Sequence, residues 1–255
     1  MSKPGVKFLA ITFLIMFAGW GTCVVLGLYG LTLSNCMPLY LPFLLGGFSP
    51  TLASYIVLKQ EKGVGLRSWL AQIFDFRQSL LAYLLPAILI LVYGIPQLLI
   101  SGYDQGAPFA MLILLIPMMV FGGGNEEAGW RHVLQPELEK RLPFVISTVL
   151  VALVWWLWHL PLFYIPGVGQ YGTNYLLFGV SVLGLSFALA AIKRITGSTL
   201  LCLLFHCLVN ALLSVFIVHE DLLGYVVSAS LLILVSVVLV LLSARFKVLL
   251  KTSSP

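Results

Sequence analysis

The fold is decided by long apolar runs, one of which reads LLAYLLPAILILVYGIPQLLIS over residues 80–101. The run carries no charged side chain, and it has the length of about 20 residues that an α-helix needs to cross a bilayer. A transmembrane β-strand would alternate apolar and polar side chains over about 10 residues, which this run does not do. We therefore expect a transmembrane helix here.

The composition extends this expectation to the whole chain. Of its 255 residues, 60% are hydrophobic and only 9% are charged, which leaves too little polar surface for a soluble domain. Because lipid cannot satisfy backbone hydrogen bonds, only helices or closed barrels span membranes. The sequence predicts an all-α, polytopic membrane protein with about eight transmembrane helices. We place them at about residues 8–30, 38–58, 80–101, 108–130, 144–165, 173–192, 197–218 and 222–243.

The charged residues orient these helices. If the N-terminus is cytoplasmic, all 14 Lys and Arg side chains fall in segments on the cytoplasmic side of the cell membrane. The opposite segments contain only Asp104, Glu220 and Asp221 as charged residues. The positive-inside rule therefore predicts that both termini are cytoplasmic. The basic residues are Lys3, Lys7, Lys59, Lys62, Arg67, Arg77, Arg131, Lys140, Arg141, Lys193, Arg194, Arg245, Lys247 and Lys251.

No internal repeat and no long linker divides the chain, so we expect one membrane domain over residues 1–255. The basic residues form no face with interleaved aromatic residues, which argues against a nucleic-acid partner. The four cysteines show no C-x-x-C spacing, and we expect neither a disulfide framework nor a cysteine metal cluster. Residues 59–79 mix charged and large apolar side chains and are expected to lie partly on the membrane surface.

The first candidate site is the run GGGNEEAGWR, residues 122–131. Ionisable groups within membrane spans are expensive, so we treat them as functional candidates. Glu127 and Arg131 lie four residues apart and are expected to pair along one helix face. Glu126 is left without a cation beside Trp130, whose ring would desolvate the carboxylate and suit it to act as a general base. The alternative is an ion network at a helix end, and the glycines either distort this helix or allow close helix packing.

The other candidates lie on later helices. A turn near residues 141–143 would bring Glu126 and His159 to the same level of an antiparallel hairpin, because both are equally far from it along the chain. Glu126 and His159 each lie about 16 residues from this turn. So long a hairpin either protrudes from the bilayer or contains a distorted fourth helix. His206 and Asn210 are one turn apart and share a helix face, ~13 Å into the membrane. Together these residues predict a polar cluster from three helices, although a membrane histidine or asparagine is often a packing residue that bonds neighbouring helices.

Three motifs in this order resemble one known family. They are E-E-x-x-x-R over residues 126–131, an aromatic residue four positions before a histidine at Trp155 and His159, and H-x-x-x-N at His206 and Asn210. The sequence resembles the CPBP group of intramembrane proteases, which includes the type II CAAX prenyl proteases and bacterial relatives tied to bacteriocin self-immunity. The motif-bearing core covers residues 122–211. The family more often has Phe where Trp155 stands.

The resemblance implies an intramembrane endopeptidase that acts on membrane-associated protein or peptide substrates, a prenylated peptide among them. We expect the site to open to the cytoplasmic side. The expected partners are the substrate and the lipid of the membrane. Glu126 would activate water, His159 would position and polarise it, and His206 with Asn210 would stabilise the oxyanion. The expected supporting residues, which orient Glu126 or hold part of the substrate, are Glu127, Arg131, Trp130 and Trp155.

The cofactor question stays open in the sequence. Glu126, His159 and His206 also make up an open zinc set, although no H-E-x-x-H motif is present. A metalloprotease and a metal-independent glutamate protease are both compatible with the spacing. We favour a protease that requires no cofactor, because Asn210 suits an oxyanion donor better than a zinc ligand.

Two other functions compete with proteolysis. Buried Glu and His also make proton relays, so a proton-coupled small transporter is one alternative. The absence of repeat symmetry counts against it. A non-catalytic immunity protein of the same fold is the other, and the complete motif set counts against that.

Overall fold

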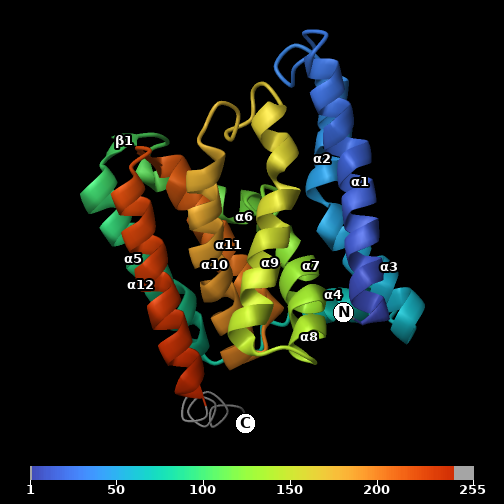
Figure 1. Ribbon diagram of the computed structural model, residues 1–255, viewed down its shortest axis with the longest axis vertical. Helices are drawn as coiled ribbons and strands as arrows, with labels where there is room; N and C mark the ends of the chain where they lie inside the picture. Colours follow the sequence, from blue (N-terminus) through green and yellow to red (C-terminus); the bar gives the residue numbers. More distant parts are fainter. Residues whose placement is uncertain (1, 244–255) are drawn as a thin grey trace.

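The computed structural model describes residues 2–243, and helices make up nearly all of its regular structure (Figure 1). The helices are α1 (Lys3–Gly27), α2 (Tyr40–Gly47), α3 (Ser49–Lys62), α4 (Leu66–Ile73), α5 (Leu80–Ser101), α6 (Leu112–Met118), α7 (Glu127–Gly129), α8 (Gln135–Glu139), α9 (Phe144–Trp158), α10 (Tyr175–Thr196), α11 (Thr199–Val215) and α12 (Leu222–Leu241). Shorter 3-10 turns cover Met37–Leu39, Phe109–Met111, Gly124–Glu126 and Leu160–Tyr164, and a π-helix covers Trp130–Leu134. Two short strands, β1 (Tyr103–Gln105) and β2 (Phe216–Val218), pair antiparallel.

Within residues 2–243, five helices are long and apolar enough to span a membrane: α1, α5, α9 with the 3-10 turn after it, α10 and α12. The pair Met37–Gly47 and Ser49–Lys62, bent by 49°, makes a sixth when it is joined. Two further apolar helices, Phe109–Met118 and Thr199–Val215, are shorter. The chain is therefore an all-α, polytopic, integral membrane protein, as predicted. The number of eight crossings stays a prediction.

Polar residues set where several helices begin and glycines set where some end. The side chains at the N-caps of α1, α5, α10, α11 and α12 accept hydrogen bonds from free backbone N–H groups of the first turn. Helices α3 and α10 end at glycines in the left-handed conformation, Gly63 (φ 67°) and Gly197 (φ 74°). These boundaries explain why the span expected at residues 80–101 coincides with α5. The capping residues are Ser2, Ser79, Asn174, Ser198 and Asp221.

The fourth expected span, residues 108–130, is not a continuous helix, and that prediction is wrong. The chain runs as α6, a turn over residues 119–123, a 3-10 turn, α7, a π-helix and α8. Helix α6 contains Pro117, which removes one helical hydrogen bond, and the helix ends at the next residue. Gly123 adopts φ 131°, a backbone conformation that residues with a side chain rarely adopt. Of the two expected alternatives, a protruding hairpin and a distorted fourth helix, the structure shows the distorted helix. The chain then turns over residues 140–143, as expected, and enters α9.

Figure 1 shows how the helices surround this broken segment. α1 packs against α2 and α3 on one flank, and α10 packs against α12 and α9 towards the other. α11 contacts α5, α6 and the 3-10 turn at Gly124–Glu126. Small residues allow the closest crossings: a Cβ on Gly184 would lie 2.8 Å from Cα of Ala229, between α10 and α12. The broken segment is therefore enclosed by helices from both flanks.

The charged residues are divided between the two ends of the molecule. The start of α1, helix α4, the α8–α9 turn and the α10–α11 turn lie at the lower end in Figure 1, and β1 and β2 lie at the upper end. The described basic residues fall in the lower-end segments, with the exception of Arg131, which is fully buried. Asp104 lies in β1, and Glu220 and Asp221 follow β2. Of the basic residues assigned to the cytoplasmic side, Arg245, Lys247 and Lys251 lie outside the described residues.

Gly19→Ala is expected to lower the unfolding temperature of the purified protein in detergent. Its methyl group would lie 2.5 Å from the backbone nitrogen of Gly46 and the carbonyl oxygen of Pro42, and backbone atoms cannot move aside. We expect a loss of about 1–3 kcal/mol, measured by thermal unfolding. Gly21→Ala, on the same helix, is the matched control because nothing lies within 4 Å of its added methyl group. Equal unfolding temperatures for the two variants would contradict the close crossing of α1 and α2.

Candidate active site

The break in the fourth segment brings three of the four predicted catalytic residues to one point beside Gly123. A Cβ added to Gly123 would lie 2.7 Å from Nδ2 of Asn210, 3.0 Å from Nε2 of His206 and 3.4 Å from Oε1 of Glu126. Glu126 belongs to the 3-10 turn after the break, and the other two residues lie one turn apart on α11. The missing side chain of the glycine thus leaves room among three polar atoms that converge from two elements.

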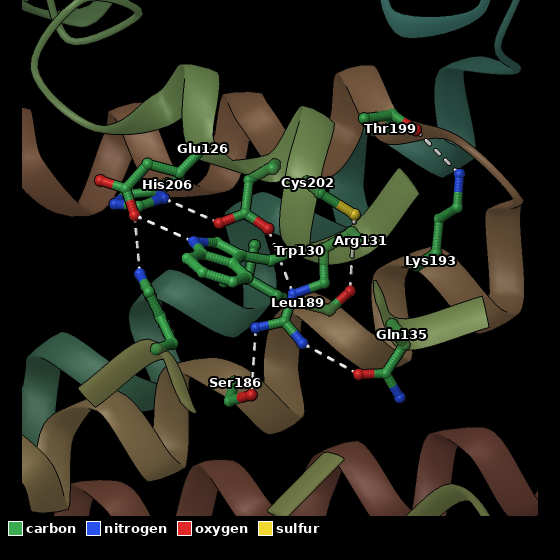
Figure 2. Close-up of polar contacts among 12 residues, drawn as sticks. Glu126, Trp130, Arg131, Gln135, Ser186, Leu189, Lys193, Thr199, Cys202 and His206 are labelled. Atoms are coloured by element: carbon green, nitrogen blue, oxygen red, sulfur yellow. Dashed lines mark hydrogen bonds and ion pairs between the residues drawn. The ribbon is translucent and has the colours of Figure 1, made fainter. Parts of the chain in front are cut away.

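Glu126 is held by two indoles rather than by a cation. Its carboxylate is 5% exposed, and its Oε2 accepts hydrogen bonds from Nε1 of Trp155 at 2.7 Å and from Nε1 of Trp130 at 3.3 Å (Figure 2). Within residues 2–243 it forms no ion pair. Trp130 is therefore a donor as well as the expected apolar wall. Both bonds fall on Oε2, so Oε1 is the oxygen that faces Gly123.

His206 is oriented by a buried ion pair. Its Nδ1 lies 2.9 Å from Oε1 of Glu127, whose Oε2 accepts from Nε of Arg131 at 3.1 Å. A carboxylate that faces a guanidinium is ionised and can only accept, so Nδ1 of the histidine carries the hydrogen. The ring is thereby fixed with Nε2 towards Gly123. The pairing of Glu127 with Arg131 confirms the prediction from their spacing.

His159 lies at the end of α9 among aromatic rings. Its Nδ1 lies 2.8 Å from the carbonyl oxygen of Trp155. Its ring packs edge-on against Trp158 and Phe178, with distances between ring centroids of 4.8 and 4.9 Å. Because a carbonyl only accepts, Nδ1 of His159 carries the hydrogen and donates it. Nε2, the other ring nitrogen, takes no part in this hydrogen bond. Within the described part of the chain, no hydrogen bond joins His159 to Glu126. Trp155 contacts both, through its backbone and its indole. His159 is thus connected to the point beside Gly123 through Trp155.

Asn210 closes the site on the more exposed side. Its Nδ2 donates to the carbonyl oxygen of Gly122 at 2.9 Å, which ties α11 to the turn before the break. Phe121 and Gly122 are exposed, and Gly123 and Asn210 are partly exposed, whereas Glu126 is buried. The polar cluster therefore reaches the surface of the protein at this turn.

The arrangement does not fit a zinc site built from Glu126, His159 and His206. Among the described residues, no three His, Cys, Asp or Glu side chains are grouped closely enough to hold a metal ion. The expectation that the reaction requires no cofactor stays a prediction.

Two residues that bind Arg131 were missed in the sequence. Nη1 of Arg131 donates to Oε1 of Gln135 at 3.1 Å, and Nη2 donates to Oγ of Ser186 on α10 at 3.0 Å (Figure 2). The four-residue spacing from Glu127 through Arg131 to Gln135 was a signal that could have found the glutamine. Nothing in the sequence pointed to the serine, which comes from a helix far along the chain. Glu127 bonds His206 and not Glu126, which differs from its expected orienting role.

Comparison with known proteins agrees with these motifs. Residues 107–212 match the family model described as type II CAAX prenyl endopeptidase Rce1-like, and this range includes every predicted site residue. The chain is also 24% identical over 242 residues to CAAX prenyl protease 2 of Methanococcus maripaludis, with 86% of this chain and 87% of that protein covered. The chain is a membrane-embedded peptidase that is similar to the type II CAAX prenyl proteases, as the resemblance of its motifs to the CPBP group implied.

Proposed function

We propose that this peptidase hydrolyses membrane-associated protein or peptide substrates with a water molecule activated by Glu126. The observation that supports this most strongly is the convergence of Oε1 of Glu126, Nε2 of His206 and Nδ2 of Asn210 around Gly123. Peptide hydrolysis needs a base for the attacking water and donors for the oxyanion that develops on the carbonyl. Oε1 of Glu126 can act as the base, and the two nitrogen atoms can donate hydrogen bonds to the oxyanion.

The proposed reaction follows from these atoms. Oε1 of Glu126 takes a proton from water as the water oxygen bonds to the scissile carbonyl carbon. His206 acts here in its doubly protonated form, which the carboxylate of Glu127 at Nδ1 stabilises. Its Nε2–H and the second N–H of Asn210 Nδ2 stabilise the negative charge that forms on the carbonyl oxygen. The protonated Glu126 then gives its proton to the leaving amine as the C–N bond breaks, so the base is restored. His159, whose ring is oriented by Trp155, positions the water.

The two indoles have a role in this scheme. Trp155 and Trp130 bind Oε2 of Glu126 and so hold the carboxylate with Oε1 towards the water. Their rings also exclude bulk water, which strengthens the electrostatic interactions at the site. An indole N–H is a donor that the phenylalanine more usual in the family at position 155 lacks.

The substrate class is proposed from the relatives. The relative from Methanococcus maripaludis is named as a CAAX prenyl protease, so we propose that this chain accepts membrane-associated peptides, including a prenylated C-terminal peptide. The basic residues at the lower end of the molecule support cytoplasmic termini in the cell membrane. That the site opens to the same side stays a prediction. No metal is required by the proposed steps. The family assignment favours this activity over a transporter or a non-catalytic immunity protein.

Glu126→Gln is expected to lower kcat by about 100-fold or more, because the amide cannot take the proton from water. The assay uses purified protein in detergent with a quenched peptide and, in parallel, a prenylated peptide. Glu61→Gln is the control, since this carboxylate pairs with Lys7 on the surface away from the site. Cleavage by the Glu126 variant at the wild-type rate would refute the proposed base.

Chelators are expected to leave the wild-type rate unchanged, because the proposed steps use protein groups alone. The protein is incubated with a strong zinc chelator, freed of it by gel filtration and assayed again. Cleavage that is lost on this treatment and restored by added zinc would contradict the metal-free mechanism.

Trp155→Phe is expected to lower kcat about 10-fold, because it removes one hydrogen bond to a charged group while keeping an aromatic ring. Trp156→Phe is the matched control, since the indole of Trp156 bonds the backbone oxygen of Tyr175 instead. Both variants are compared by kcat and KM on the same peptide. An equal effect of the two substitutions would show that the bond to Glu126 does not matter for the reaction.

A further inference from the structure

A chain of polar contacts runs from the site to the surface at the lower end of the molecule. Beyond Arg131 the contacts continue through Gln135, whose Nε2 donates to Oε1 of Glu139 at 2.7 Å. Oε2 of Glu139 then pairs with Nη1 of Arg194 at 3.1 Å, where the arginine is exposed. The glutamine is 1% exposed, so it cannot reach substrate. The steps from His206 to Gln135 can be followed in Figure 2.

The backbone keeps these side chains in one row. Glu127, Arg131, Gln135 and Glu139 are spaced by four residues, and in a regular α-helix each such step drifts by about 40° round the axis. The π-helix over Trp130–Leu134 lies in the middle of the row. Its wider turn rotates less per residue, so it offsets the drift of the α-helical turns on either side. The irregular helix therefore serves to hold the row together.

The polarity of the row allows one orientation of the glutamine. The guanidinium of Arg131 can only donate, and the carboxylate of Glu139 can only accept. The amide of Gln135 must therefore turn its oxygen to the arginine and its nitrogen to the glutamate, and Oγ1 of Thr148 accepts from the same nitrogen at 3.2 Å. A carboxylate or an ammonium at this position would face a like charge on one side.

We propose that Gln135 is a positioning residue for the peptidase and that it keeps Nε2 of His206 directed at the reaction point. It acts through Arg131, which binds Glu127, which binds Nδ1 of His206. If the amide is lost, Nη1 of Arg131 loses its partner, and a buried charged donor without a partner drives rearrangement of the side chains around it. The proposal rests on the proposed function, because it assigns His206 to the stabilisation of the oxyanion.

Gln135→Leu is expected to lower kcat by about 10- to 100-fold while KM changes by less than about threefold, because misplacement of a group that acts in the transition state affects the chemical step. Gln97→Leu is the matched control. It removes a glutamine of equal burial, 2% exposed, from α5 and is expected to leave kcat unchanged. Wild-type kcat in a folded Gln135→Leu variant would overturn the proposal.

A polarity exchange provides the second test, which does not depend on the folding of the leucine variant. Gln135→Glu alone places two carboxylates side by side and is expected to lower kcat. Adding Glu139→Gln gives an amide whose nitrogen faces the new carboxylate and whose oxygen faces Arg194. The contacts from Arg131 to Arg194 are thereby restored, and only the bond from position 135 to Thr148 is lost. We expect kcat of the double variant to return to within about threefold of wild type. Equal kcat values for the single and double variants would overturn the proposal.

The failure of this inference can be told from failure of the proposed function. If Glu126→Gln cleaves at the wild-type rate, the proposed function fails, whatever the Gln135 variants do. If Glu126→Gln is inactive and the Gln135 variants cleave as wild type, only the positioning role fails. Thermal unfolding of each variant in detergent identifies the folded proteins that are compared.

Discussion

Burial of Glu127 and Arg131 inside a membrane protein requires a partner for each polar atom that they carry. Both side chains are 0% exposed, and an isolated charge in such surroundings is costly. The structure meets this demand with His206 from α11, Ser186 from α10 and Gln135 from the next turn of the same segment. Three parts of the chain are thereby fixed against one another around one ion pair. The orientation of the histidine at the site is a direct consequence.

The break at Gly123 is the second constraint on the site. A continuous helix over residues 108–130 would have no gap in which to place a scissile bond among the polar atoms that face α11. The left-handed turn at the glycine lets the chain restart as a 3-10 turn with Glu126 directed at His206 and Asn210. Irregular backbone at membrane depth is tolerated where protein surrounds it, and here α11 and α3 pack against the turn.

The sequence predicted the parts of this structure that follow from local rules. The fold class follows from the apolar runs, the pairing of Glu127 with Arg131 from their spacing, and the turn over residues 140–143 from the placement of proline and charged residues. The broken fourth helix was only one of two expected solutions, because glycines also serve close packing. The contact of Glu127 with His206 and the role of Ser186 depend on how three helices meet, which no local pattern specifies. The π-helix over Trp130–Leu134 was not predicted either.

In the proposed reaction, Glu126 activates water and does not itself attack the peptide. A single turnover with enzyme in excess, carried out in ¹⁸O-labelled water and analysed by mass spectrometry, tests this most directly. We expect the label to appear in the new carboxylate of the cleaved peptide during the first turnover and to be absent from the enzyme peptide that contains Glu126. Label in the Glu126 side chain after that turnover would contradict it, because it would reveal a covalent intermediate.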